Sequence, residues 1–214
     1  MNTSKKTFVV VDYGMGNLKS VVNAFKFLGE SAKISNKRKD IEKADAIIIP
    51  GVGAFGEAMN NLQKLDLVKI LNKKVLKDKV PMLGICLGMQ LIAQDSEEGG
   101  FNKGFGWIDG HVRKIKVYNN TRLPHVGWND ISILKKKPLF NNISKDCNFY
   151  FVHSYYVDCD ESIVSAETKY DVKITAAIQK ENMFATQFHP EKSQENGLRV
   201  LKGFINFVQN YKYA

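Results

Sequence analysis

Short apolar runs alternate with helical patterns in the first half of the chain. Three continuous apolar runs predict buried strands: TFVVVDY (7–13), ADAIIIPG (44–51) and VPMLGIC (80–86). We expect Pro50 to cut the second strand, because proline lacks the N–H that a sheet requires. Apolar residues at helical spacing over 17–29 predict a helix that Gly29 ends, and LGMQLIAQ (87–94) predicts the start of another. Apolar strands separated by helices favour a parallel sheet covered on both faces.

Beyond residue 105 the pattern favours strands. The strand-like stretches are GFGWIDGHVRKIKVY (104–118), NFYFVHSYYVD (148–158), VKITAAIQ (172–179) and MFATQFH (183–189), and a closing helix is predicted near 195–210. The predicted fold is therefore α/β, with a central, mostly parallel mixed sheet, helices on both of its faces and an antiparallel extension. Because no repeat, low-complexity segment or linker interrupts the chain, we expect residues 1–214 to form a single domain.

Composition limits the classes of partner. The chain has 214 residues and a net charge of +9, which would permit binding to nucleic acid. The lysines are scattered among acidic residues, however, without an aromatic-rich RNA motif or a basic recognition helix. We expect no nucleic-acid partner, and a basic face that meets an acidic protein or a phosphorylated metabolite remains a hypothesis.

The cellular location is predicted from what the sequence contains near its start and from its cysteines. The opening MNTSKK leads straight into an apolar strand, unlike a secretory signal, and no apolar run approaches the ~20 residues that span a bilayer. Cys86, Cys147 and Cys159 form no evident disulfide framework or CxxC metal pair, which suits a reducing compartment. We expect a cytoplasmic protein without a metal or other cofactor and without membrane contact.

A cysteine between two glycines stands where the third apolar run meets a helical pattern. In GICLGMQ (84–90), the order G-x-C-x-G between a strand and a helix is the context that a nucleophile elbow requires. Such a sharp turn exposes Cys86 at a helix N-terminus, where the positive end of the helix dipole favours thiolate over thiol. The alternative is a cysteine packed between sheet and helix, since free cysteine is among the most buried residue types.

A cysteine nucleophile needs a base and a group that orients the base. His189 lies in ATQFHPEKS just past an apolar strand, and Glu191 follows two residues later with Pro190 stiffening the link. This spacing lets the carboxylate reach the ring, so Cys86, His189 and Glu191 form a candidate triad. The alternative for HPE is an ordinary surface turn.

A glycine-rich turn ends the second apolar run. In PGVGAF (50–55), peptide N–H groups of Gly51, Val52 and Gly53 can point at a developing oxyanion, together with the N–H of Leu87 after the nucleophile. Taken alone, the turn would be an ordinary connection from strand to helix. Beside the cysteine elbow it becomes a candidate oxyanion hole.

These motifs together resemble those of the class I (triad) glutamine amidotransferases. The resemblance spans about residues 8–207 and rests on DYGMGNLKSV, PGVGAFGEAM, GICLGMQL, PHVGWN, YFVHSYY and QFHPEKS. GxCLGMQ and QFHPE are shared across that class, whereas DYGMGN, PGVGAF and PHVGWN resemble the glutaminase subunits of imidazole glycerol phosphate synthases. The resemblance implies a flavodoxin-like amidotransferase fold and L-glutamine as substrate.

The resemblance also implies a reaction. Cys86 would attack the glutamine side-chain amide, His189 would protonate the departing ammonia, and the γ-glutamyl thioester would be hydrolysed to glutamate. Glu191 would orient His189, and the 51–53 turn would complete the oxyanion hole only when a partner is loaded. From the reference pKa values of cysteine and histidine, activity is expected to rise near neutral pH as the thiolate and a neutral His189 become available.

Further roles follow from the resemblance alone. Positions that hold the glutamine amino-acid head in the family match Gln90, Glu98, Ser154 and Tyr155. The ammonia would pass to a (β/α)8-barrel cyclase in histidine biosynthesis, forming a heterodimer through Trp128 of PHVGWN, with polar contacts from Asn17, His125 and Asn129. The alternatives are solvated or strand-end surface residues for the first set and core packing for Trp128. His111 and His153 are predicted to be structural, and Cys147 and Cys159 have no assigned role.

Three competing functions stay open. A paralogous glutaminase would supply ammonia to a sugar-amidating synthase in surface polysaccharide biosynthesis. A non-catalytic scaffold would keep the fold, although its expected signature is a broken triad, and Cys86, His189 and Glu191 are all present. A general cysteine hydrolase or protease would share the nucleophile, but Gln90, Ser154 and Tyr155 favour glutamine.

Overall fold

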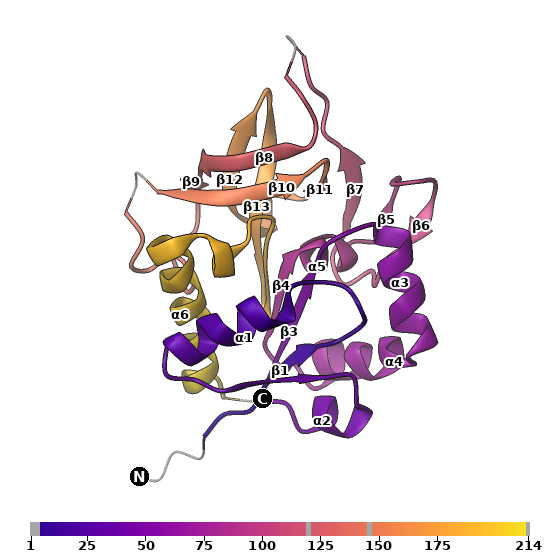
Figure 1. The fold of residues 1–214 in the computed structure, drawn as a ribbon, viewed down its shortest axis with the longest axis vertical. Coiled ribbons are helices and arrows are strands. Elements are labelled where there is room, and N and C mark those ends of the chain that lie inside the picture. Colours follow the sequence, from indigo (N-terminus) through magenta and orange to yellow (C-terminus); the bar gives the residue numbers. More distant parts are fainter. Residues whose placement is uncertain (1–4, 119–120, 145–146, 213–214) are drawn as a thin grey trace.

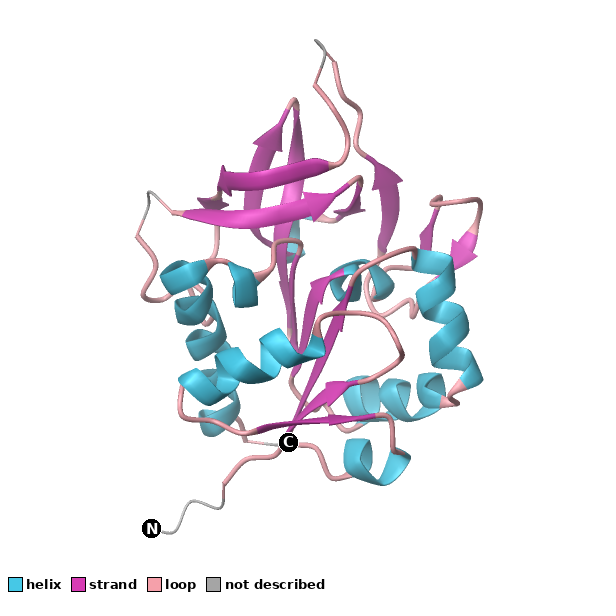
Figure 2. Ribbon diagram, viewed as in Figure 1, coloured by secondary structure: helices cyan, strands magenta, loops and turns pink. Residues whose placement is uncertain are grey.

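The computed structural model describes residues 5–118, 121–144 and 147–212. Within these residues an eight-stranded mixed sheet runs through the molecule (Figures 1 and 2). Its parallel part consists, in spatial order, of β2 (Ala32–Ser35), β1 (Phe8–Val11), β3 (Ala46–Gly51), β4 (Met82–Cys86) and β14 (Met183–Thr186). This order places β14, from late in the sequence, directly against β4.

Helices cover both faces of this sheet, as the apolar runs predicted (Figure 1). They are α1 (Leu18–Phe27), α2 (Arg38–Glu42), α3 (Phe55–Lys64), α4 (Leu67–Asn72) with a π-helical turn (Lys73–Lys77), α5 (Leu87–Leu91) and α6 (Gln194–Asn210). Phe8 and Val10 of β1 pack in one core with α1 and α6, while Val9 and Val11 pack in the other with α3 and α4. Because alternate residues of a strand face opposite sides, a strand buried on both faces is apolar throughout.

Antiparallel strands extend the sheet beyond β14. They are β13 (Val172–Lys180), β12 (Val164–Tyr170) and β9 (Ser132–Ile133). Two smaller sheets lie beside this extension: β8 (His125–Asp130) with β10 (Asn148–His153), and β11 (Tyr155–Cys159) with β7 (Gly110–Lys114), β5 (Asp95–Ser96) and β6 (Asn102–Lys103). Single 3-10 turns lie at Glu161–Ile163 and Pro190–Lys192. The predicted mixed sheet with an antiparallel extension is confirmed.

Two sequence expectations need correction. The second strand is not cut at Pro50, because β3 continues to Gly51. Its pairing with β1 ends at Ile48, so Pro50 lies where β3 keeps only β4 as a neighbour and a missing N–H is tolerated. The stretch 148–158 is not one strand, since it divides at Ser154 into β10 and β11, which belong to different sheets.

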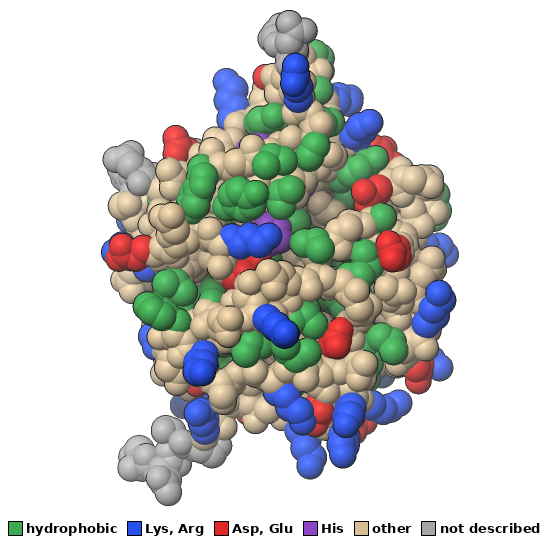
Figure 3. Space-filling view, viewed as in Figure 1, with side chains coloured by type: hydrophobic (Ala, Val, Ile, Leu, Met, Phe, Trp, Pro, Cys, Tyr) green, Lys and Arg blue, Asp and Glu red, His purple; other side chains and the backbone are tan. Residues whose placement is uncertain are grey.

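The outer surface carries an apolar area over β8 and β10 (Figure 3). Val126 and Trp128 of β8 are 56% and 45% exposed, which excludes core packing as the role of Trp128. Lysine and arginine side chains are spread over the rest of this view rather than gathered at one site. Across the described residues, no helix has the length and apolar character needed to span a membrane.

Candidate active site

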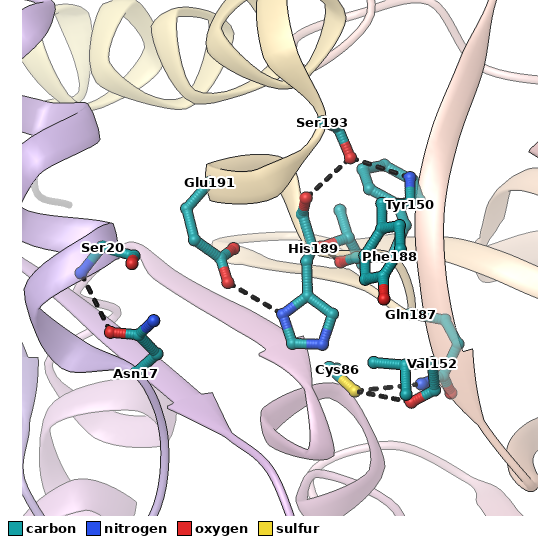
Figure 4. Close-up of polar contacts among 11 residues, drawn as sticks. Asn17, Ser20, Cys86, Tyr150, Val152, Gln187, Phe188, His189, Glu191 and Ser193 are labelled. Atoms are coloured by element: carbon teal, nitrogen blue, oxygen red, sulfur yellow. Dashed lines mark hydrogen bonds and ion pairs between the residues drawn. The ribbon is translucent and has the colours of Figure 1, made fainter. Parts of the chain in front are cut away.

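The carboxyl ends of three neighbouring strands bring the candidate catalytic residues together. Gly51 at the end of β3 pairs with Cys86 at the end of β4, and Thr186 of β14 pairs with Ile85. His189 follows β14 by three residues, so its ring reaches the space above Cys86 (Figure 4). Parallel strands end at a common edge, which is where ligands bind in open α/β sheets.

Cys86 occupies a sharp turn between β4 and α5. Its backbone has φ +54° and ψ −108°, a conformation that residues other than glycine rarely adopt and that is found at functional sites. The flanking glycines are required by close packing: a Cβ at Gly88 would lie 1.6 Å from the carbonyl oxygen of Ile49, and one at Gly84 would lie 2.7 Å from that of Gly88. The structure therefore contains the elbow predicted from G-x-C-x-G.

His189 and Glu191 form a buried pair beside the cysteine. Nδ1 of His189 lies 2.8 Å from Oε1 of Glu191, and the side chain of each is 3% exposed. The backbone of His189 is fixed by two bonds: its N–H donates to Tyr150 O at 3.0 Å, and its carbonyl accepts from Ser193 Oγ at 2.6 Å. With Nδ1 engaged, Nε2 is left without a hydrogen-bond partner among the described residues and is available to exchange a proton.

The surroundings of His189 favour its charged form. Burial lowers the pKa of the ring, but the neighbouring Cys86 and the Glu191 carboxylate favour the imidazolium more strongly and raise the pKa to about 9. His189 is therefore protonated at neutral pH. The expectation from reference values, a neutral ring near pH 7, is wrong because those values omit the buried carboxylate and the sulfur.

The glycine-rich turn lies beside Cys86, as an oxyanion hole would require. Gly51 is buried against Leu87, and Val52 and Gly53 are exposed, with Gly53 at φ +101°. The hydroxyl of Tyr13 donates to Pro50 O at 2.6 Å and braces the turn from beneath. Burial and the charge of Cys86 raise the pKa of Tyr13, so its phenol keeps the proton that makes this bond. DYGMGN contains Tyr13, but sequence reasoning gave it no role.

Three of the four predicted glutamine-binding residues are linked to one another. Gln90 is buried, and its Nε2 donates to the carbonyl of Tyr155 at 2.9 Å. Burial and the nearby Glu98 raise the pKa of the Tyr155 phenol. Glu98 in turn accepts from the N–H of Phe55 at 2.8 Å, just after the glycine-rich turn. Ser154 lies at the junction of β10 and β11.

Two groups at the sulfur were missed by sequence reasoning. Gln187 is fully buried, and its Nε2 donates to Cys86 Sγ at 3.7 Å. The carbonyl of Val152 lies 3.9 Å from the same sulfur, within reach of a thiol S–H (Figure 4). Because every second residue of an extended segment faces the same side, the sequence could place Gln187 on the side of His189, but it could not show what the amide contacts.

The predicted interface residues are divided between surface and interior. Trp128 is exposed on β8 with its ring edge-on to Tyr150, while Asn17 caps α1 by accepting from Ser20 N (Figure 4). His125 is only 3% exposed, and its ring contacts His153 and Asn129. It supports β8 from the inside rather than lining its outer face.

The remaining candidates lie away from this centre or in the core. His111 pairs with Asp95 at 2.9 Å, Cys147 is buried in the core, and burial raises the pKa of the half-buried Cys159 to about 11. None of the three cysteines, all of them in described residues, forms a disulfide. In the described part of the chain, no three His, Cys, Asp or Glu side chains gather in a way that could hold a metal ion.

Comparisons with known proteins identify a family. Residues 9–207 match the family described as glutamine amidotransferase class-I. The chain is 48% identical to the imidazole glycerol phosphate synthase subunit HisH 1 of Campylobacter jejuni (strain RM1221), over 92% of this chain and 98% of the relative. It is 44% identical to subunit HisH 2 of Vibrio vulnificus (strain YJ016), over 95% and 96%, and 42% identical to subunit HisH of Bacillus cereus (strain B4264), over 95% and 96%.

Solved structures share the fold at low sequence identity. The structure of PurLQS from Thermotoga maritima matches with a TM-score of 0.74 and 16% identity, over 96% of this chain and 100% of that one. A glutamine amidotransferase from the same organism matches with a TM-score of 0.66 and 13% identity, over 97% and 100%. These likenesses concern the fold alone.

Proposed function

The chain belongs to the class I glutamine amidotransferase family, and on this premise we propose that it is the glutaminase subunit of an imidazole glycerol phosphate synthase in histidine biosynthesis. The observation that carries the activity is the strained Cys86 elbow beside the buried pair of His189 and Glu191. The choice of synthase rests on relatives 42–48% identical that bear this name over more than nine-tenths of the chain.

The geometry supports nucleophilic catalysis on a carboxamide. The Cys86 thiolate attacks the side-chain carbon of glutamine, and the oxygen of the tetrahedral adduct is received by the N–H of Leu87 and by N–H groups of the 51–53 turn. Protonated His189 gives its proton to the leaving ammonia, and a thioester remains. Neutral His189 then takes a proton from the attacking water, and collapse of the second tetrahedral adduct releases glutamate and expels the Cys86 thiolate beside protonated His189. Glu191 stabilises the imidazolium throughout.

Glutamine recognition is assigned to the residues near Cys86. We infer that Gln90, Glu98, Ser154 and Tyr155 hold the amino-acid head of the substrate, with the carboxylate of Glu98 suited to an ammonium group. The support is that Gln90 bonds to the Tyr155 carbonyl and that Glu98 lies near both the Tyr155 phenol and the glycine-rich turn.

The name of the relatives implies a partner, and we infer that it is a (β/α)8-barrel cyclase that consumes the ammonia. Ammonia released to water would take up a proton and lose its nucleophilicity, so a sealed contact is needed. The exposed Val126 and Trp128 on β8 support a contact there, because aromatic anchors dominate interface energetics. Asn17 at the start of α1 and Asn129 beside His125 stay candidates for polar contacts with the partner, and His125 supports β8 from within.

We further infer one domain over residues 1–214 and a cytoplasmic location. The family match over 9–207 and the insertion of β14 between β4 and β13 both favour a single unit. Cysteines outside disulfides are consistent with a reducing compartment.

The proposed function is tested by measuring glutamate released from glutamine, first by the chain alone and then with a histidine-pathway cyclase and its nucleotide ligand. We expect low basal turnover, strong stimulation by the loaded cyclase, and loss of both in Cys86→Ala. Basal turnover without stimulation would contradict this synthase and favour another acceptor. Absence of turnover in both conditions would contradict a glutaminase.

A further inference from the structure

Gln187 is a buried amide whose nitrogen meets the sulfur of the nucleophile. The residue has no exposed surface, and its Nε2 lies 3.7 Å from Cys86 Sγ. Figure 4 shows Gln187 and Val152 on one side of the sulfur and the ring of His189 on another. An N–H donor at this position stabilises a thiolate, whereas the Val152 carbonyl, an acceptor at 3.9 Å, suits only the thiol.

The orientation of the Gln187 amide follows from its neighbours. The carbonyl of Tyr155 can only accept, so the group of Gln90 that faces it at 2.9 Å is the NH₂. The same NH₂ lies 3.1 Å from the other end of the Gln187 side chain, which must therefore be its oxygen. The NH₂ of Gln187 is then the end that faces Cys86.

The Tyr155 carbonyl also accepts from a second series of hydrogen bonds, which runs through two histidines to β8. His153 Nδ1 lies 2.9 Å from the Tyr155 carbonyl and must donate to it. In a neutral ring Nε2 then accepts, and it lies 3.0 Å from His125 Nδ1, which donates. His125 Nε2 accepts in turn from Asn129 Nδ2 at 3.2 Å. All three bonds run in one direction, and they require both rings to be neutral.

Burial keeps both rings neutral. It lowers the pKa of His125 to about 4 and that of His153 to about 3, and the positive charge of His189 contributes to the second shift. Phe151 and Tyr170 stack on the His125 ring, and the groups that bond the two rings, Asn129 and the Tyr155 carbonyl, are neutral. The donors and acceptors in the hydrogen bonds of His125 and His153 therefore stay the same across the working pH range of the enzyme.

We propose that the side-chain N–H of Gln187 stabilises the Cys86 thiolate, that the Tyr155 carbonyl fixes the direction of that N–H through Gln90, and that His153 and His125 hold this carbonyl in place through hydrogen bonds that reach β8. Gln187 is then a further catalytic residue, because it touches the reacting sulfur, and His153 and His125 are positioning residues. The inference deepens the proposed function, since it concerns the nucleophile of the glutaminase. It also links the nucleophile to the strand that carries Trp128.

The first test measures alkylation of Cys86 by iodoacetamide against pH, with the modified peptide quantified by mass spectrometry. Gln187→Glu puts a carboxylate oxygen against the sulfur, and the pH of half-maximal rate is expected to rise by at least about one unit. Gln187→Met removes the donor without adding charge, and the rate at pH 7 is expected to fall about tenfold. The matched control is Gln63→Glu, the same change at an exposed position of α3, which is expected to keep the wild-type profile.

The second test separates positioning from packing at His153. His153→Leu removes the donor to the Tyr155 carbonyl, whereas His153→Asn keeps an N–H at the same distance along the side chain. We expect the leucine variant to shift the Cys86 alkylation profile upward and to lower kcat for glutamine at least fivefold, and the asparagine variant to restore most of both. Tyr170→Phe is the control, because it keeps the stack on His125 and removes only a hydroxyl that donates to Arg122 O.

Wild-type alkylation profiles in Gln187→Glu and Gln187→Met would overturn the role of Gln187. Equal defects in the two His153 variants would overturn the positioning role of the hydrogen bond from His153 to the Tyr155 carbonyl. If Gln187→Glu does not give a cooperative thermal unfolding transition, Gln187→Met carries the test alone. Alkylation uses the chain without glutamine or partner, so its outcome is independent of whether the glutaminase proposal holds.

Discussion

At the scale of single residues, the charge of His189 depends on two neighbours, Cys86 and Glu191. Burial alone would lower the pKa of this histidine, and Cys86 and Glu191 reverse the direction, to about 9. A protonated ring therefore places a positive charge beside the sulfur of the nucleophile. The same ring is then ready to act as the acid for the leaving ammonia.

Removal of the Glu191 charge is expected to move the alkaline limit of activity. His189 is an acid only below its pKa, so wild-type kcat for glutamine should fall as the pH rises through about 9. In Glu191→Gln only Cys86 still opposes the effect of burial, so the fall should occur at least about one pH unit lower, with reduced kcat. Initial rates of glutamate release at saturating glutamine measure this.

The control for this prediction is Glu195→Gln on α6, which removes the same charge from an exposed ion pair with Arg199. An unchanged alkaline limit in Glu191→Gln would contradict the role of this carboxylate.

The stability of the fold depends on the same pKa. Because the pKa of His189 is raised in the folded state, protonation of the ring stabilises the fold; the contribution is complete below pH 6.5 and is lost as the pH rises through about 9.

Residues of the triad were predictable from sequence, and Gln187 was not. Cys86, His189 and Glu191 stand in short motifs whose spacing itself indicates their chemistry. The direction of the Gln187 amide depends on Gln90, 97 positions away, and on a backbone carbonyl of another sheet. Such contacts exist only after the strands have been assembled, so no local pattern reports them.

At the scale of elements, the elbow between β4 and α5 is determined by backbone contact. The helix begins so close to β3 that there is no space for a side chain at Gly88, whose Cβ would overlap the Ile49 carbonyl. The sequence predicts a sharp, crowded turn between the two glycines, and the crowding is confirmed by the close approach of α5 to β3 at Gly88. The positive φ belongs to Cys86 itself.

Gly88→Ala is therefore expected to destabilise the chain by about 3 kcal/mol or more, because a rigid backbone carbonyl cannot move aside. Urea unfolding followed by circular dichroism measures the change. Gly29→Ala is the comparison: Gly29 also departs from ordinary backbone geometry, at φ +83°, but a Cβ there meets no atom within 4 Å, so its cost should be only about 1 kcal/mol. Equal losses in the two variants would contradict the contact explanation.

At the scale of the whole molecule, the apolar area on β8 lies on the side of the sheet where the strands with the catalytic residues end (Figures 1 and 3). A contact there would place a partner near the site of ammonia release. The sequence did not predict β8 as a strand, because a proline precedes it and a glycine interrupts its few apolar residues. The alternation of buried and exposed residues is visible only in the structure. The motif PHVGWN pointed to the same segment only through family resemblance.

Trp128→Ala is expected to weaken binding of the cyclase roughly tenfold or more, because a central aromatic anchor is removed. Isothermal titration calorimetry with the cyclase measures the dissociation constant. The matched control is Leu65→Ala, a similarly exposed apolar residue at the end of α3. A dissociation constant for Trp128→Ala within twofold of the wild type would argue against β8 as the contact.

The position of β14 in the sheet also has a consequence for biosynthesis. Gln187 and His189 follow β14 directly, and they lie beside a cysteine that the ribosome adds 101 positions before Gln187. A nascent chain therefore carries a thiol without its base or its amide donor until β14 has docked between β4 and β13. We therefore expect activation of the nucleophile to coincide with completion of the sheet, and an unfinished polypeptide to leave cellular glutamine intact.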